Sequence, residues 1–385
     1  MRKWPTQMDQ PSKSHATFRN TILRWYRANR REYPWRRDYD PYRVWLAEVM
    51  LQQTRIAAVI SYYEKFLRRF PHVKALARGS EHEVLRCWAG LGYYSRARNL
   101  HRAAREIAKR HGGVFPRTLD EALALPGIGR YTAAAVLSIA YGAPHAVVDG
   151  NVARVLARLG AVRGDLRAPG RWPQLAATAQ ELLAVKSARD WNQAMMELGQ
   201  TICTPKSPRC GECPVREFCK AHERGLVDKI PERRRKRVTV RQRIAAAVLL
   251  DPRGRTLLVR DPGAHDDVLF SRMWQFPALE SARDGSTELI THLHERYGVE
   301  AAAPKELSAS KHGVTFRDIT LMPFLFRVES LPAIPRSRRL PLAQIARVPL
   351  SSATRKIAES ALRAINSEVT DEASPRSHRG TRMLN

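Results

Sequence analysis

The chain has 385 residues, enough for two or three domains that each bury a core of their own. Lysine and arginine outnumber aspartate and glutamate 66 to 37, and the formal net charge is +29. Such an excess favours polyanionic partners, and nucleic acid fits better than a membrane because no long apolar run or lipidation motif is found. An arginine-rich proteome would explain part of this charge.

Changes in composition along the chain predict five segments. Residues 1–15 and 367–385 are polar and unpatterned, so we expect disordered tails. Residues 16–220 carry apolar side chains at helical spacing and predict an all-α domain. Residues 221–241 contain a run of arginine and lysine that predicts a solvated basic linker. Residues 242–366 combine strand-like and helical patterns, which predicts an α+β domain.

The first chemically suggestive residue is Glu48. It follows the helix start Asp40-Pro41 and lies in residues 44–51, which are otherwise apolar on every side. Burial there raises the pKa of a carboxyl group, so Glu48 is a candidate general acid. The alternative is a buried glutamate paired with an arginine.

A basic helix and a helical hairpin come next. Four basic residues spaced along residues 95–110 predict one charged face, which is either a DNA contact or an ordinary solvated surface. Thr118 begins a short helix, and a second helix runs from Arg130 to Tyr141. Gly127 and Gly129 in the turn between them allow unusual backbone angles and expose N–H groups to a phosphate, although an ordinary helical turn would use the same residues. The basic residues are Arg98, Arg102, Arg105 and Lys109.

A second carboxylate, Asp149, precedes a helix that starts near Val152. The helix dipole favours its ionised form, and a plain N-cap role is the alternative. Cleavage of a bond to an anomeric carbon needs one protonated carboxyl and one carboxylate. Glu48 and Asp149 together supply that pair.

Four cysteines follow in the spacing C-x6-C-x2-C-x5-C, and a fifth, Cys87, lies apart from them. Four thiolates saturate an iron–sulfur cluster or a structural zinc ion. The unequal spacing favours the cluster over zinc, and disulfides are the remaining alternative. The ligands would be Cys203, Cys210, Cys213 and Cys219.

In the second domain, residues 243–250 and 255–260 are aliphatic runs on either side of the turn sequence 251–254, which predicts a hairpin. Residues 315–328 again have a strand pattern. Residues 351–365 carry apolar side chains at helical spacing.

Taken in order, these motifs make the chain similar to the MutY-type adenine DNA glycosylases of the helix-hairpin-helix, endonuclease III-like superfamily. The resemblance covers almost the whole chain. It rests on the cysteine loop, the hairpin and four further motifs, Tyr33-Pro34-Trp35-Arg36, residues 45–54, residues 90–99 and residues 148–152.

The resemblance implies an enzyme that flips adenine out of duplex DNA when it is mispaired with 8-oxoguanine or guanine. Glu48 would protonate N7 of the base, and Asp149 would stabilise the sugar cation with help from Tyr131 and Asn151. The cysteine loop would hold a [4Fe-4S] cluster. The remaining substrate and DNA contacts that it implies are Trp35 and Gln193 at the flipped base, Gln53 and Tyr93 at the stack, Gly127, Gly129, Lys206 and Arg209 at the backbone, and Thr54.

The resemblance also separates two activities. Superfamily members that cut the strand carry a Schiff-base lysine where this chain has Tyr131. A phenol cannot form that adduct, so we expect a monofunctional glycosylase that leaves an abasic site.

The second domain resembles the Nudix-like domain with which the family reads 8-oxoguanine. The metal-binding glutamates of a Nudix hydrolase are missing from residues 291–299, apart from Glu295. The recognition loop of the family typically ends in Phe-Ser-His, whereas this chain reads His312-Gly313-Val314-Thr315-Phe316. His312 or Thr315 would therefore have to make the contact with the lesion.

Three other functions share some of these features: a catalytically silent DNA-binding module, a hydrolase of the nucleotide pool, and a bifunctional lyase that acts on pyrimidine lesions. We expect a monomer that acts on double-stranded DNA in the cytoplasm of a bacterium, at the nucleoid, with no membrane partner.

Overall fold

The computed structural model describes residues 14–232, 238–260, 273–282, 285–314 and 316–372. The chain forms two compact units, residues 1–87 with 93–236 and residues 88–92 with 237–385. The division near residue 236 falls inside the segment predicted as a linker. The two units are described separately below.

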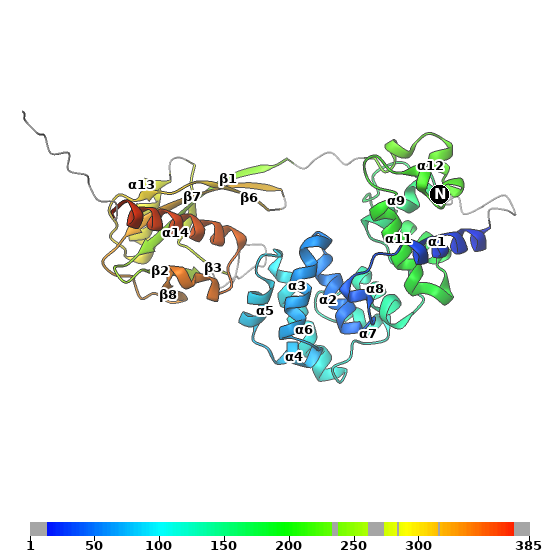
Figure 1. Ribbon diagram of the computed structural model, residues 1–385, viewed down its shortest axis with the longest axis horizontal. Coiled ribbons are helices and arrows are strands. Elements are labelled where there is room, and N and C mark those ends of the chain that lie inside the picture. The colour runs from blue at the N-terminus through cyan, green and yellow to red at the C-terminus, as the bar shows by residue number, and fades with distance from the viewer. Residues whose placement is uncertain (1–13, 233–237, 261–272, 283–284, 315, 373–385) are drawn as a thin grey trace, which may run out of the picture. The chain divides into compact units, whose positions relative to one another are not determined.

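The first unit is helical, and residues 14–232 contain no strand, as predicted (Figure 1). Its helices are α1 (His15–Asn29), α2 (Pro41–Leu51), α3 (Ile56–Arg69), α4 (Val73–Arg78), α5 (Glu81–Trp88), α6 (Tyr94–Arg110), α7 (Leu119–Leu123), α8 (Arg130–Tyr141), α9 (Gly150–Leu159), α10 (Arg171–Leu182), α11 (Ala188–Thr201) and α12 (Lys220–Glu223).

The packing of this unit centres on α8, which contacts both α2 and α11, while α9 also packs on α11. The three consecutive alanines of α8, residues 133–135, are buried, and their small side chains let neighbouring helices approach closely. Helix α2 is buried from Val44 to Met50, as its uniformly apolar sequence predicts. Residues of α2, α8, α9 and α11 are thereby brought around one region.

The helical hairpin forms as predicted, with α7 and α8 joined by the glycine turn. Thr118 caps α7 and accepts a hydrogen bond from the Glu121 N–H at 3.4 Å. Gly127 has φ +73°, and a Cβ atom there would lie 2.5 Å from Cβ of Asn99, so only glycine fits. The same expectation is wrong for Gly129, whose φ of −92° is ordinary; the space around it is open, since a Cβ there would meet nothing within 4 Å.

The predicted basic face of α6 needs a correction. Arg102, Arg105 and Lys109 are exposed, but Arg98 is buried. The helical spacing of the basic residues therefore predicted the exposed positions correctly for three of the four residues.

The boundary predicted at residue 221 is also displaced, because the first unit stays packed up to Ile230. Ala221 and Ile230 are both buried. The buried guanidinium of Arg158 on α9 donates from Nε to the Ile230 carbonyl at 2.8 Å and from Nη1 to the Thr204 carbonyl at 2.8 Å. One arginine therefore anchors both the cysteine loop and the segment beyond it.

The second unit is a mixed sheet with one helix on each face, so the predicted α+β class is confirmed. Strand order is β3-β2-β1-β7-β5; β4 pairs with β1, β6 with β7 and β8 with β2. The elements are β1 (Val240–Leu250), β2 (Arg255–Arg260), β3 (Trp274–Gln275), β4 (Ala278–Glu280), α13 (Ser286–Tyr297), β5 (Lys305–Glu306), β6 (Ser310–Val314), β7 (Arg317–Arg327), β8 (Ser337–Pro341) and α14 (Ser352–Glu372).

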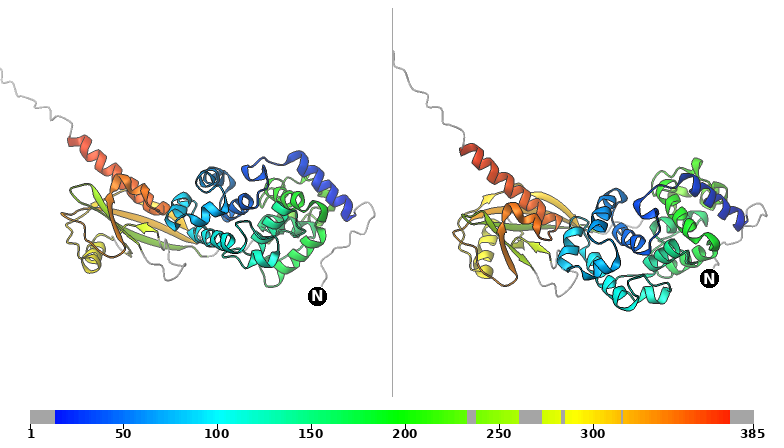
Figure 2. Two further views of the ribbon diagram at one scale, coloured as in Figure 1. Left: turned by 90° about the horizontal axis from the view of Figure 1, so that it is seen from below. Right: turned by 60° about the horizontal axis from the view of Figure 1, so that its bottom comes forward.

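The central strand β1 buries side chains on both faces, since residues 245, 247 and 249 join one core cluster and residues 246, 248 and 250 join the other. Helix α13 contributes Leu289 and Leu293 to the first cluster, and α14 contributes Ile357 and Ala361 to the second. Figure 2 shows these helices on opposite faces of the sheet. Helix α14 continues to Glu372, past the boundary expected at residue 366.

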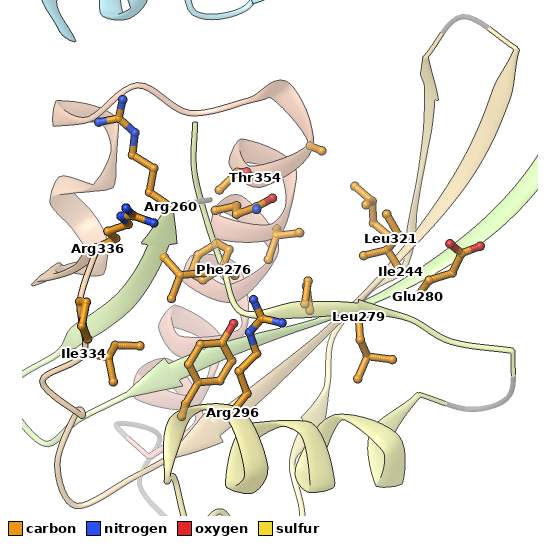
Figure 3. A pocket seen from close by; sticks show the side chains of 18 residues that line it. Ile244, Arg260, Phe276, Leu279, Glu280, Arg296, Leu321, Ile334, Arg336 and Thr354 are labelled. Atoms are coloured by element: carbon orange, nitrogen blue, oxygen red, sulfur yellow. The ribbon is translucent and has the colours of Figure 1, made fainter. Parts of the chain in front are cut away.

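The sheet opens between β1 and β2, which pair only at Leu250 and Thr256. A cavity of about 760 Å³ has both strands in its walls. In Figure 3, Phe276 lies in the middle of this cavity and Arg260 and Arg336 lie at one end. Among the described residues that line it, Glu280 is the single acid.

We predict that Arg158→Ala lowers the free energy of unfolding of the first unit by about 2–4 kcal/mol, because it leaves two partly buried carbonyl groups without a donor. Urea unfolding followed by helical circular dichroism measures this on the full chain loaded with its cluster. Arg167→Ala, at an exposed arginine, is the matched control. Identical midpoints for the two variants would contradict the anchoring role.

Candidate active site

The first unit contains a cavity of about 740 Å³ at the meeting of α2, α8, α9 and α11, a size typical of small-molecule and base-binding pockets. The structure brings most of the predicted chemical residues together in its walls. These are Trp35, Glu48, Gln53, Thr54, Tyr131, Asp149, Asn151 and Gln193.

Glu48 lies in the wall of this cavity and is buried, with 7% of its surface exposed. The Tyr131 hydroxyl donates to Oε2 of Glu48 at 2.8 Å. Burial raises the pKa of Glu48 to about 7, with a further rise from the charge of Asp149; the Tyr131 hydrogen bond and the Arg36 charge oppose it. A neutral carboxyl is therefore available near pH 7, as the sequence predicted.

Asp149 has the N-cap role that was its alternative, and it also lines the cavity. Its Oδ1 accepts hydrogen bonds from the N–H groups of Asn151 (2.9 Å) and Val152 (2.7 Å), and its Oδ2 accepts from Nδ2 of Asn151 at 2.8 Å. Three donors thus fix the orientation of the carboxylate.

Asn151 is fixed in turn by Arg154, whose Nη2 donates to Oδ1 of Asn151 at 2.9 Å. The same guanidinium donates to the carbonyls of Gly199 and Cys203, both at 2.7 Å. A run of hydrogen bonds therefore connects Asp149 with the first cysteine of the loop.

An ion pair beside the cavity was missed from the sequence. Nη1 of Arg36 lies 2.7 Å from Oε2 of Glu197, and both side chains are largely buried. Glu197 also accepts from the Arg31 N–H at 2.9 Å. The sequence contains a signal for it, because Glu197 is the single charged residue in the C-terminal half of α11, as Glu48 is in residues 44–51 of α2.

The aromatic side of the cavity holds Trp35, which is buried and stacks on Tyr33 with ring centroids 5.1 Å apart. Gln193 is buried as well, and its Nε2 donates to the Arg189 carbonyl at 3.3 Å. Trp172 was not predicted; it lines the cavity with 42% of its surface exposed, and no periodic pattern marks it.

Gln53 and Thr54 line the cavity, but the other residues predicted to contact the DNA backbone or stack are not among its lining residues. Tyr93 is the N-cap residue of α6 and is 43% exposed. Lys206 is exposed. Arg209 is exposed too, but it donates to the Thr201 carbonyl at 2.8 Å and pairs with Glu212 at 2.8 Å. Gly127 and Gly129 lie in the hairpin turn.

In the second unit, His312 lies in β6 opposite Ile319 of β7 and is half-buried. Burial, together with the charge of Lys356, lowers the pKa of His312 and favours its neutral form. Thr315, the other predicted lesion contact, lies outside the described residues.

The four loop cysteines line one small cavity between α9 and the loop, together with Arg158 and His222. All five cysteines of the chain are free, which contradicts the disulfide alternative. Within the described ranges, no three His, Cys, Asp or Glu side chains converge closely enough for a single metal ion. Burial raises the pKa of Cys213 to about 12, and coordination to a metal centre would favour its thiolate form.

Comparison with known proteins agrees with this geometry. The model for the HhH-GPD superfamily of base excision DNA repair proteins matches residues 46–184, and that for the iron–sulfur binding domain of endonuclease III matches residues 203–219. The adenine DNA glycosylase of Mycolicibacterium smegmatis is 41% identical over 231 residues, covering 60% of this chain and 78% of that protein. The chain belongs to the adenine DNA glycosylase family. The cysteine loop is accordingly its iron–sulfur domain.

The human adenine DNA glycosylase is 47% identical over 218 residues, which cover 54% of this chain and 40% of the human protein. The match thus spans less than half of that relative's length. Among solved structures, a thermostable thymine-DNA glycosylase shares 31% identity with a TM-score of 0.50, over 55% of this chain and 97% of that protein. The helical fold is thus shared with a glycosylase that is named for thymine.

In the part of the chain that the structure describes, no helix has the length and apolar character needed to cross a bilayer.

The raised pKa of Glu48 predicts a pH-dependent stability. Because its pKa is about 7 in the folded state and near 4.5 otherwise, the free energy of unfolding falls as pH rises between these values. From pH 5.5 to 8.5 this loss is about 2 kcal/mol at 1.36 kcal/mol per pKa unit. Urea titrations should show the loss in the native chain and not in Glu48→Gln. An equal pH dependence in both proteins would contradict the raised pKa.

Proposed function

We propose that this chain is a DNA glycosylase that hydrolyses the N-glycosidic bond of adenine mispaired with 8-oxoguanine or guanine in duplex DNA. One observation carries the proposal: a buried carboxyl, Glu48, and a fixed carboxylate, Asp149, share a cavity of about 740 Å³. A pocket of this size admits an extruded base but no intact duplex.

The reaction begins with neutral Glu48, whose carboxyl proton passes to N7 of adenine. Protonation makes the base a better leaving group, and the C1′–N9 bond breaks with its electron pair going to the base. The sugar is left as an oxocarbenium-like cation. The Tyr131 hydroxyl holds the Glu48 side chain in place for this transfer.

Asp149 then acts on the sugar. Its carboxylate is oriented by the Asn151 and Val152 N–H groups and stabilises the positive charge at C1′. Water adds to C1′ and loses a proton, and an abasic site remains. Asn151 and Arg154 keep the carboxylate from turning away from the sugar.

The [4Fe-4S] cluster, when bound, supplies a cross-link among four thiolates rather than an open coordination site. The loop that it fixes presents Lys206 and Arg209 for DNA phosphates. Trp35 and Gln193 would contact the flipped adenine, and Gln53, Thr54 and Tyr93 the base stack. The hairpin turn with Gly127 and Gly129 would bind the backbone at the N-terminus of α8.

Absence of an amine supports a monofunctional reaction. Among the described residues, the side chains that line the cavity include no lysine, and Tyr131 stands at the start of α8. We further propose that His312 or Thr315 of the second unit contacts 8-oxoguanine on the opposite strand, and that the chain acts as a monomer.

Bacterial relatives favour the bacterial cytoplasm and nucleoid as its place of action.

Glu48→Gln should reduce single-turnover adenine release from an adenine:8-oxoguanine duplex by about 10²–10⁴-fold, because glutamine cannot donate the proton. In the native chain the rate should fall as pH rises through about 7, the pKa of Glu48. Glu64→Gln, at an exposed acid of α3, is the control. Duplexes with adenine opposite guanine and thymine establish the substrate order: 8-oxoguanine, then guanine, then thymine. Full activity of Glu48→Gln would refute the assigned acid.

Borohydride treatment of the native chain with the same duplex should trap no covalent protein–DNA adduct, because the cavity-lining residues that the structure describes offer no amine to form a Schiff base. A lysine-dependent DNA lyase run in parallel controls for the trapping chemistry. Stoichiometric adduct formation would show a bifunctional enzyme instead.

A further inference from the structure

Arg96 of α6 is buried, although arginine rarely is. Its Nη1 donates to the carbonyls of Val49 (2.9 Å) and Met50 (3.0 Å) and also to that of Gln52. Its Nη2 donates to Oγ1 of Thr54 at 3.2 Å. The last carbonyls of a helix lack partners within the helix, so this guanidinium closes the end of α2 and the start of the following loop.

The residues next to these contacts have unusual backbone angles. Gln53 has φ +58° and Tyr93 has φ +47°, both in the left-handed region that non-glycine residues rarely adopt. Such conformations cost about 1–3 kcal/mol each and persist only when the surroundings impose them. The Arg96 side chain contacts both sides: it donates to the neighbours of Gln53, and its Cζ lies 5.3 Å from the Tyr93 ring centroid. Its backbone N–H also donates to the Tyr93 carbonyl at 2.9 Å.

The two strained residues are both accessible to a ligand. Gln53 lines the cavity, and Tyr93 has 43% of its surface exposed, unusual for a large aromatic side chain. Arg96 itself is not among the cavity-lining residues. Any effect of Arg96 on the reaction must therefore act through the residues that it contacts and their neighbours, Gln53 and Tyr93 among them.

We propose that Arg96 is a positioning residue that locks Gln53 and Tyr93 into one rigid pair, and that this pair opens the base stack so that the target adenine can leave the duplex. The inference rests on the proposed function, because it names the residue on which base extrusion depends. Unstacking a base step costs a few kcal/mol of the binding free energy. Side chains that are already ordered before binding lose no conformational entropy, so more of the binding free energy remains for unstacking.

Arg96→Met separates this role from the chemistry of bond cleavage. We would compare the native chain, Arg96→Met, Arg96→Lys and the control Arg110→Met, an exposed arginine of the same helix, each as the full chain with its cluster loaded. One duplex carries the target adenine in a normal stack opposite 8-oxoguanine. The second carries it between two abasic sites, where it is already unstacked. In a third, 2-aminopurine replaces adenine and reports unstacking by fluorescence.

Arg96→Met should lower the 2-aminopurine signal and should slow adenine release from the stacked duplex by about 10- to 100-fold. Release from the unstacked duplex should change less than about 3-fold, because Glu48 and Asp149 are intact. Arg96→Lys should be intermediate, since an ammonium group cannot reach all four acceptors. Arg110→Met should match the native chain.

Equal losses on the stacked and unstacked duplexes would overturn the proposal, because Arg96 would then support the fold or the catalytic residues generally. No loss on either duplex would overturn it as well. If the native chain unstacks 2-aminopurine but releases no adenine, the proposed function fails while the unstacking signal still decides the role of Arg96. A native chain that gives no unstacking signal would overturn the positioning role.

Discussion

A carboxyl group removed from water is the constraint on which the structure of this site depends. Glu48 is surrounded by the apolar residues of α2, so its charged form is disfavoured and a proton stays on it near neutral pH. Two features stabilise the buried carboxyl group. The Tyr131 hydroxyl donates a hydrogen bond to one of its oxygens, and the small alanines of α8 let that helix lie close enough to α2 for this bond to form. Without a partner of this kind a buried polar group would cost about 1–3 kcal/mol.

The two carboxylates of the cavity owe their different chemistry to different surroundings. Glu48 has one neutral donor and apolar neighbours. Asp149 has three N–H donors at the start of a helix, and the Asn151 amide that supplies one of them is itself held by Arg154. Arg154 and Arg158 of the same helix then bond the cysteine loop, so α9 joins the site to the iron–sulfur domain. The orientation of the Asp149 carboxylate and the integrity of the cysteine loop thus both depend on α9.

Much of this was available from the sequence because it depends on local signals. Glu48 stands out in an apolar helix, Asp149 at a helix start, and the cysteines by their spacing. What could not be predicted depends on partners distant in the chain. Glu197 pairs with Arg36 from 161 residues away, and Arg96 reaches the Thr54 hydroxyl from 42 residues away. Periodicity also assigned Arg98 to a solvated face, whereas the structure buries it. The local sequence does not show whether an arginine is buried or exposed, because burial depends on tertiary contacts.

The central claim is that Glu48 keeps its proton near neutral pH in the folded chain, and infrared difference spectroscopy tests it most directly. Subtracting the spectrum of Glu48→Gln from that of the native chain isolates the carboxyl group. A protonated C=O band should be present at pH 6 and absent at pH 8.5. A difference spectrum that shows only an ionised carboxylate at pH 6 would contradict the account.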